Sequence, residues 1–291
     1  MPKNRRDILR LASGGWAASL LAFLSPKARA SGRGHDAIDK SVPSRLDAMP
    51  MPLDRQHLSD PDLSRRIKEI SNVFEVGRPE PDYAYVEDLG DGRGYTVTQY
   101  GFCTYNSEVT QVIERYAAKR PSTPLKRFLS QLPPHKWTDQ DLDDFPHVWR
   151  REISAGPLLG QACDKEADVL YFDPAVESAA AVGVTSPVGI AIFYDTLLQH
   201  GAGADPDSLP SILKRTLEKN GDVSDTSESQ FLRAFLKVRR SVLENASNHE
   251  TRKVWRQSVR RVDALLGLLD ANPNLVPPIT IANADVNATI L

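Results

Sequence analysis

The fold depends on residues 74–103, which read FEVGRPEPDYAYVEDLGDGRGYTVTQYGFC. The first part is the end of a helix that begins near Asp60-Pro61, since a proline directly after an N-cap residue is a common helix start. Apolar residues recur at helical spacing up to Phe74, and Gly77 then stops the helix. A glycine-rich turn between two short strands follows. We therefore expect a helix that leads directly into an antiparallel hairpin.

The hairpin itself is expected between Tyr83 and Phe102. Aromatic and β-branched residues alternate in part over Tyr83–Asp88 and again over Gly94–Phe102, which is typical of short strands. The pair Asp91-Gly92 between them is a signal for a tight turn. Glycine also stands at positions 90, 92 and 94, which would let a polymer lie close to the backbone.

Each half of this stretch carries one carboxyl group of interest. Glu75 lies in the last helical turn beside the buried Phe74, where the helix dipole and partial burial both favour the protonated form. Asp91 lies in the turn of the hairpin. Such a pair suits cleavage of a glycosidic bond, because one acid protonates the leaving oxygen and the other holds or activates a water. An exposed helix-end glutamate and a purely structural turn are the competing interpretations.

The rest of the chain has mainly helical patterns. Ser107 begins one helix, residues 125–132 form a short one, and the polar residues 133–146 form a loop in which Trp137 is a candidate anchor. The tail after Pro277 is expected to be extended. Six further helices are expected, over residues 157–170, 174–182, 187–200, 208–219, 228–246 and 251–270. The predicted fold class is mainly α with one small antiparallel β-sheet, lysozyme-like α+β in outline.

Residues 1–30 have the pattern of an export signal. Asn4–Arg10 is similar to a twin-arginine motif, Leu11–Leu24 is apolar, and Ala28–Ala30 offers a small-x-small cleavage site. The apolar run is shorter than the roughly twenty residues that span a bilayer, so a membrane anchor is the weaker interpretation. We expect a flexible leader over residues 31–57, a catalytic domain of two lobes over 58–291, and a secreted or periplasmic protein.

Charge and cysteine content exclude some classes of protein. Residues 1–30 hold six basic residues and one acidic residue, so without them the formal charge falls from −2 to about −7. So acidic a chain is a poor candidate for nucleic acid and suits a cationic partner, although the charge could serve solubility alone. Cys103 and Cys163 lack zinc-like spacing, and a disulfide between them is left open. The sequence has no metal-binding cluster or phosphate loop, and we expect no cofactor.

Several blocks together resemble glycoside hydrolase family 46, the chitosanases, over roughly residues 58–280. A lone Gly-Asp-Gly would not be specific, but the order and number of the blocks are. They are the helix ending in Glu75, Tyr85-x-Glu87-Asp88-x-Gly90-Asp91-Gly92-Arg93-Gly94-Tyr95-Thr96, Gly101-Phe102-Cys103, Tyr171-Phe172-Asp173-Pro174-Ala175-Val176, Tyr194-Asp195, His200-Gly201 and Phe235-Leu236-x-x-Arg239. The resemblance implies two mostly helical lobes flanking a substrate cleft. It also implies endo-hydrolysis of chitosan, a β-1,4-linked glucosamine polymer, with inversion at the anomeric carbon.

The resemblance further implies a role for each matching residue. Glu75 would be the general acid, Asp91 the general base, and Thr96 would help to hold the attacking water. Inversion requires space for that water, so the two carboxyl groups should lie roughly 6.5–9.5 Å apart, or farther in an open cleft. Arg93, in the same turn as Asp91, would contact the sugar or steady the nearby acids.

Other substrate contacts are implied for Glu108, Tyr171 and His200. Glu108 would pair with a glucosamine ammonium group, although helix N-termini favour acids for their own sake. Tyr171 and His200 would line sugar subsites. Their alternatives are a core tyrosine and a histidine interacting with the C-terminal end of a helix dipole.

A buried supporting network that reaches the acid is implied for Asp195 and two arginines, Arg239 and Arg252. Arg239 could instead be a solvated charge, but its apolar neighbours favour burial, and a buried arginine needs a carboxylate. The chain departs from the family pattern at Val76-Gly77, in a shorter bend before the hairpin, and at Ala202. These departures concern subsites and cleft width rather than the reaction.

Two other functions compete with chitosan hydrolysis. A hydrolase of another β-1,4 polymer, such as peptidoglycan or chitin, is disfavoured by Glu108 and by the acidic charge, because those polymers lack free amines. A non-catalytic chitosan-binding protein is disfavoured by the presence of both Glu75 and Asp91. The expected partners are chitosan and glucosamine oligosaccharides, without nucleic acid and without a membrane in the mature form, and we expect a monomer.

Overall fold

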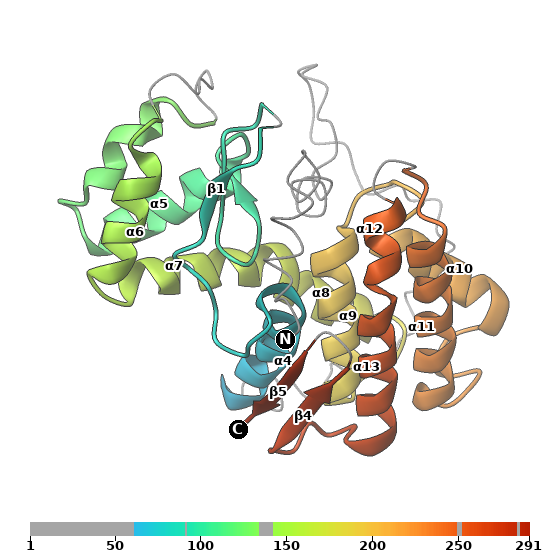
Figure 1. The fold of residues 1–291 in the computed structure, drawn as a ribbon. Helices are drawn as coiled ribbons and strands as arrows, with labels where there is room; N and C mark the ends of the chain where they lie inside the picture. Colours follow the sequence, from blue (N-terminus) through green and yellow to red (C-terminus); the bar gives the residue numbers. More distant parts are fainter. Residues whose placement is uncertain (1–60, 91, 134–141, 249–251, 284–285) are drawn as a thin grey trace.

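The computed structural model describes residues 61–90, 92–133, 142–248, 252–283 and 286–291 of the chain. Within these ranges the protein is mostly helical with little sheet, as predicted (Figure 1). The helical elements are α4 (Pro61–Val76), α5 (Ser107–Lys119), the 3₁₀ helix η2 (Pro124–Ser130), α6 (Phe145–Ser154), α7 (Leu158–Ala167), the π-helical segment η3 (Asp168–Phe172), α8 (Asp173–Ala180), α9 (Pro187–His200), α10 (Leu209–Asn220), α11 (Glu228–Glu244), α12 (Arg252–Gln257) and α13 (Val259–Ala271). The expected export signal and leader lie outside the described residues.

The strands form two small antiparallel sheets. The strands are β1 (Val86–Asp88), β2 (Tyr95–Val97), β3 (Phe102–Cys103), β4 (Ile279–Ala282) and β5 (Asn287–Ile290). The first sheet has the order β1-β2-β3, and the second pairs β4 with β5. The tail that the sequence predicted as extended is therefore a second hairpin. It packs against α4, and Arg65 Nη2 donates to the backbone oxygen of Leu291 at 2.7 Å.

The predicted catalytic hairpin is present, but its connection is longer than a tight Asp-Gly turn. Asp88 lies opposite Tyr95, so residues 89–94 form the connection between β1 and β2. Gly90 and Gly92 have φ angles of 69° and 76°, in the left-handed region that glycine adopts without steric cost. The carboxyl of Asp88 also accepts a hydrogen bond from Gly90 N at 2.8 Å, which fixes the start of the loop.

Helix α6 was not predicted from the sequence. It begins at Phe145, within the polar stretch that was interpreted as a loop, and only one face is buried. Phe145, Val148, Trp149 and Glu152 form that face at helical spacing, so the signal was present but short. Trp137 lies outside the described residues.

Two predicted helices are joined, and one is divided. Helices α7 and α8 are connected without a break by η3, where the backbone N–H of Asp173 bonds to Asp168 O, five residues earlier. Pro174 has no N–H to give to the carbonyl four residues before it, and this favours a local widening of the helix. The helix expected over residues 251–270 is divided at Ser258 into α12 and α13. In Figure 1, α7 extends between a group that contains α5, α6 and β1 and a group that contains α8–α13.

Helix α9 is the central element of the second group. Every residue from Val188 to His200 is buried, and α4, α8, α10 and α13 pack around the helix. Ser186 caps its start by accepting a hydrogen bond from Gly189 N at 3.1 Å, and Gly201 ends it with a φ angle of 72°. A polar side chain in such a helix must find hydrogen-bond partners inside the protein. Asp195, Gln199 and His200 of α9 therefore indicate a buried polar network.

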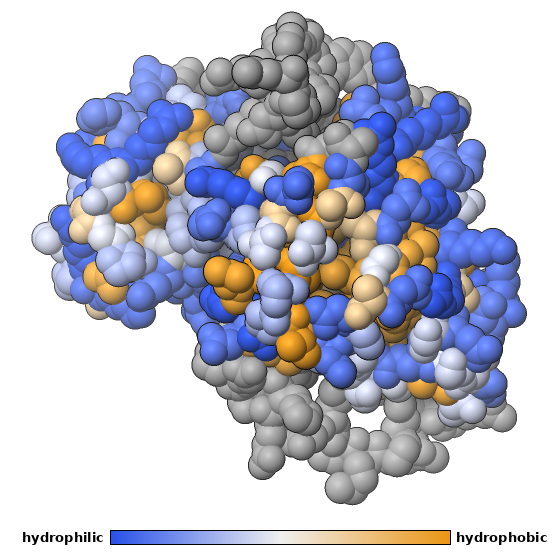
Figure 2. All heavy atoms as spheres, turned by 60° about the horizontal axis from the view of Figure 1, so that its bottom comes forward, coloured by the Kyte–Doolittle hydropathy of each residue, from blue (hydrophilic) through white to orange (hydrophobic). Residues whose placement is uncertain are grey.

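One face of the molecule combines polar and apolar side chains. Figure 2 shows hydrophilic side chains around the edges of this face and apolar ones between them. In the part of the chain that the structure describes, no helix is long and apolar enough to cross a bilayer, and no group of side chains could hold a metal ion. Cys103 and Cys163 are both buried, and no disulfide joins them.

Candidate active site

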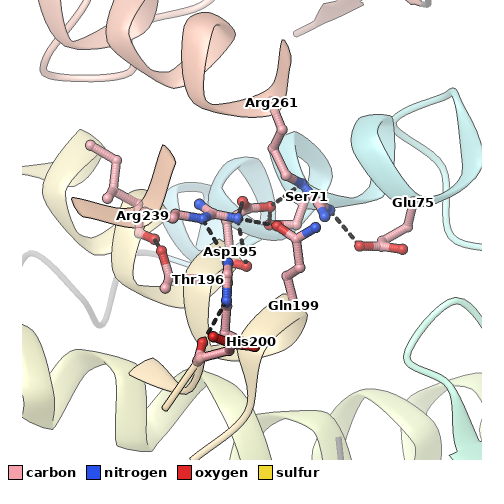
Figure 3. A network of polar contacts seen from close by, with 10 residues as sticks. Ser71, Glu75, Asp195, Thr196, Gln199, His200, Arg239 and Arg261 are labelled. Atoms are coloured by element: carbon pink, nitrogen blue, oxygen red, sulfur yellow. Dashed lines mark hydrogen bonds and ion pairs between the residues drawn. The ribbon is translucent and has the colours of Figure 1, made fainter. Parts of the chain in front are cut away.

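Four helices contribute polar side chains to one buried network (Figure 3). Ser71 and Glu75 are four residues apart on α4, and Asp195 and Gln199 have the same spacing on α9, so each pair lies on one helix face. The members are Ser71, Glu75, Asp195, Gln199, His200, Arg239 from α11 and Arg261 from α13. The sequence analysis placed Glu75, Asp195 and Arg239 in such a network, and the structure brings these three together.

Asp195 is the centre of the network and is fully buried. Its Oδ2 accepts a hydrogen bond from Arg239 Nη2 at 2.7 Å, and its Oδ1 accepts one from Ser71 Oγ at 3.0 Å. Arg261 Nε lies 3.1 Å from Oδ1, an ion pair that lacks hydrogen-bond geometry. A buried carboxylate with two cationic partners and a hydroxyl donor is well compensated for its loss of water.

Arg261 connects Asp195 to the predicted acid. Its Nη2 donates to Glu75 Oε1, and its guanidinium lies 5.0 Å from the centre of the Phe74 ring. Burial acts to lower the pKa of Arg261, but the charges of Asp195 and Glu75 outweigh burial, and the pKa is raised. Burial lowers the pKa of Arg239, against the opposing effect of Asp195. With both acids and both arginines ionised, the four groups sum to zero charge.

The second arginine of the network is thus Arg261, and the assignment of Arg252 was wrong. Arg252 is the first residue of α12, and its Nε donates to the backbone oxygen of Ala246 at 2.8 Å. Arg261 lies one helix farther along, on the buried face of α13 with Val262 and Leu265. The packing of α13 against α9 places Arg261, and not Arg252, beside Asp195.

His200 does not lie on an open surface of the described structure. It is 3% exposed, its Nδ1 is 2.7 Å from the backbone oxygen of Asp207, and its Nε2 is 3.3 Å from Arg239 Nε. Burial, together with the charge of Arg239, holds its pKa well below the usual value. The structure therefore places His200 within the buried network, beside Arg239.

Glu108 and Tyr171 lie together in a separate, half-buried group. Burial raises the pKa of Glu108 to about 7; its own backbone N–H and Asn106 oppose this shift, while the charge of Glu166 adds to it. Its Oε2 is buried without a hydrogen-bond partner among the described residues. Burial, with the charges of Glu108 and Glu166, also raises the pKa of Tyr171, whose ring stacks on Phe102 with 6.4 Å between centroids.

The hairpin of β1 and β2 is close to the group of Glu108 and Tyr171. The charge of Arg93 acts to lower the pKa of Glu108. The backbone oxygen of Arg93 accepts hydrogen bonds from Cys103 Sγ at 3.1 Å and from Thr104 Oγ1 at 3.3 Å. Thr96 is 3% exposed in β2, where it pairs with Glu87 and Cys103. Asp91 lies outside the described residues, so its predicted role and its distance from Glu75 remain predictions.

Three members of the network were missed by the sequence analysis: Ser71, Gln199 and Arg261. Each stands at a position that the helical pattern assigns to the buried face. Ser71 follows Ile70 in α4, Gln199 ends a run of apolar residues in α9, and Arg261 precedes Val262 in α13. A polar residue at a buried helical position is the signal that could have found them.

Comparison with known proteins identifies the family of the chain. Residues 69–279 match the model of glycosyl hydrolase family 46, so the chain belongs to this family and is a glycoside hydrolase. Among curated proteins it is similar to a chitosanase of Bacillus subtilis (strain 168), with 37% identity over 227 residues, or 75% of this chain and 81% of the relative.

Two solved structures support the same assignment. The native chitosanase from Bacillus subtilis MY002 is 36% identical with a TM-score of 0.71, covering 80% of this chain and 99% of that one. A family 46 chitosanase from Gynuella sunshinyii, in complex with chitotetraose, is 34% identical with a TM-score of 0.69, covering 79% and 98%.

Proposed function

We propose that this chain is an endo-acting chitosanase that cleaves β-1,4 glucosamine linkages with inversion. Glu75 would be the general acid, Asp91 the general base, and Thr96 would help to position the attacking water. The observation that carries the proposal is the contact of Arg261 with Glu75, in which a four-helix network holds one carboxyl at the end of α4. Relatives named as chitosanases, one of them bound to chitotetraose, support the choice of polymer.

The network suits a group that gives up a proton. Arg261 engages Oε1 of Glu75, and the Glu75 side chain is 15% exposed, so the carboxyl is both fixed and within reach of solvent. When Glu75 passes its proton to the leaving oxygen, the new carboxylate charge faces Arg261 directly. Because Asp195 and Arg239 hold Arg261, little reorganisation is needed at that moment, which is how preorganised charges lower a barrier.

The hairpin suits the opposite role. Asp91 stands in the sequence between Gly90 and Gly92, and both glycines have the left-handed backbone that glycine adopts without steric cost. An inverting base must leave room for one water between itself and the sugar. Thr96, on the paired strand β2, has a hydroxyl that can both accept from and donate to a water.

Glu108 is suited to recognise the amine of chitosan. Burial raises the pKa of Glu108 to about 7 without sugar, and a glucosamine ammonium group beside it would favour the ionised form. The carboxylate would then make a charge-assisted hydrogen bond through its unpartnered Oε2. Arg93 and Tyr171 lie near this carboxyl, as their mutual electrostatic effects indicate. We assign all three to substrate binding, and His200 no longer belongs to that set.

The test is to measure reducing ends released from highly deacetylated chitosan, chitin and cell-wall sacculi. Wild type should cleave chitosan, and Glu75→Gln should lose at least about 99% of the turnover, since general acid catalysis contributes about 10²–10⁴-fold. Glu80→Gln, at an exposed position five residues along, is the control. A Glu75→Gln variant with half of the wild-type rate would show that Glu75 is not the general acid. Cleavage of chitin or sacculi without cleavage of chitosan would show that the substrate is another polymer.

We also propose that residues 1–30 direct export through a twin-arginine route. Expression of the full chain in a bacterium, followed by N-terminal sequencing of the exported form, should give a start near Ser31. Replacing Arg5 and Arg6 by Lys should hold the protein in the cell. Unchanged export would contradict the assignment.

A further inference from the structure

His200 has neighbours that fix the position of its ring proton. A backbone carbonyl only accepts hydrogen bonds, so the Nδ1 that faces Asp207 O at 2.7 Å must carry hydrogen. The Nε–H of an arginine only donates, so the Nε2 that faces Arg239 Nε at 3.3 Å must present a lone pair. The two contacts together are compatible with one state only, the neutral imidazole with hydrogen on Nδ1.

We propose that His200 is a positioning residue, whose neutral Nδ1–H ring orients Arg239 and, through Asp195 and Arg261, the acid Glu75. This inference rests on the proposed function of Glu75. It gives His200 a task in the reaction without contact with the sugar.

The anchor beneath His200 is itself fixed. Asp207 Oδ2 accepts hydrogen bonds from both the backbone N and the Oγ of Ser247 at 2.7 Å. Asp207 N donates to Asp205 Oδ1 at 3.0 Å. The ring of His200 also meets Trp255 edge-on, with 5.0 Å between centroids. The imidazole is therefore held by hydrogen bonding at one end and by packing on its side, which leaves Nε2 aimed at Arg239.

Arg239 depends on three acceptors for its orientation. The Nε–H of Arg239 donates to His200 Nε2, and its Nη2 donates to Asp195 Oδ2 at 2.7 Å and to Gln199 Oε1 at 2.6 Å. Its Nη1 is buried without a partner in the part of the chain that the structure describes. Loss of the acceptor at His200 would leave a second guanidinium nitrogen unpaired and let the plane rotate away from Asp195. Since Asp195 Oδ1 faces Arg261, such a rotation would reach Glu75.

Protonation of His200 would act against the same arrangement. The charged groups around it are Arg239 on α11 and Arg261 on α13, and both oppose a further positive charge; Asp195 on α9 lies beyond Arg239. Burial acts in the same direction, so the pKa lies well below its usual value. His200 therefore stays neutral, and an acceptor, at the mildly acid pH at which chitosan is soluble and charged.

A matched pair of substitutions isolates the acceptor. The amide nitrogen of Asn overlays Nδ1, so His200→Asn keeps the donor to Asp207 and removes the acceptor for Arg239, whereas the longer His200→Gln restores an oxygen or nitrogen at the place of Nε2. His200→Asn should lower kcat on chitosan about tenfold or more, in line with loss of a hydrogen bond to a charged group, with little change in KM. It should also move the basic limb of the kcat pH profile, which reports the ionisation of the general acid. His200→Gln should recover most of both, and the exposed His147→Asn should behave as wild type.

Two outcomes of the kinetics would overturn the proposal. Equal kcat and pH profile for His200→Asn and His147→Asn would show that the acceptor has no role. A raised KM with unchanged kcat would return His200 to substrate contact. In either case wild type still cleaves chitosan, whereas an inactive wild type would refute the proposed function itself.

Should the His200 variants fail to fold, ¹⁵N-histidine NMR of the wild-type protein decides. One imidazole signal is expected to stay in the neutral Nδ1–H form well below the pH, about 6.5, at which an ordinary histidine becomes half protonated. Titration of every histidine signal near pH 6–7, or a buried Nε2–H form, would refute the neutral Nδ1–H state of His200.

Discussion

Replacing Arg261 by Met is the sharpest test of the network. Met keeps much of the side-chain volume and removes the charge, so the effect is mainly electrostatic. The Arg261 and Asp195 side chains are 4% and 0% exposed, and Glu75 is 15% exposed. The four ionised groups sum to zero in the wild type, and the variant leaves one buried negative charge uncompensated. Removing one partner of a buried pair costs about 3–5 kcal/mol.

That loss is large beside the total stability of a domain, about 5–15 kcal/mol. With a urea m-value of about 1–3 kcal/mol per molar, the unfolding midpoint should fall by at least about 1 M. Chitosan turnover should also fall by more than tenfold, because Glu75 loses the partner that matches its charge after proton transfer.

The control is Arg260→Met, at the exposed neighbouring position of α13. A surface change of this kind is expected to stay within about 0.5 kcal/mol of wild type. The free energy of unfolding of Arg261→Met could fall by less than about 1 kcal/mol, or the variant could match Arg260→Met in urea unfolding and in turnover. Either result would show that Arg261 does not hold Glu75 in the network.

The remaining predictions concern the other two carboxyl groups. The pKa of Glu108 is raised to about 7, so the folded protein keeps a proton that the unfolded chain releases from about pH 4.5; wild-type stability should therefore fall between these values. Glu108→Gln should remove this loss of stability, so the variant should be more stable than wild type at pH 7.5, by at most about 3 kcal/mol, and equally stable at pH 4.5. Urea unfolding at both pH values measures this difference. The same difference at the two pH values would contradict the burial of this carboxyl. Asp91→Asn should be nearly inactive on chitosan, and proton NMR of fresh wild-type products should show the α-anomer, whereas the β-anomer would mean retention and exclude Asp91 as the water-activating base.

Local patterns in the sequence were sufficient for the framework of the fold. The helix that ends at Gly77, the hairpin around Asp91 and the buried helix that ends at His200 follow from capping residues, glycines and apolar spacing, all of which act within a few residues. The mainly helical class with little sheet is confirmed, and so is membership of family 46. Helix α6 was missed because its apolar face rests on few residues next to a polar stretch.

The partners of the acid were decided only by the tertiary structure. Glu75 and Arg261 are 186 residues apart, and Asp195 and Arg239 are 44 apart, so no local pattern relates them. Arg252 and Arg261 have the same charge and similar neighbours in sequence, and the choice between them follows from which face of α13 packs on α9. The same packing encloses His200 beside Arg239 and away from the surface. The sequence alone was sufficient to identify the family and to predict Glu75 as the acid, because both depend on contiguous blocks. The charges that hold Glu75 are set by contacts between helices that are distant along the chain.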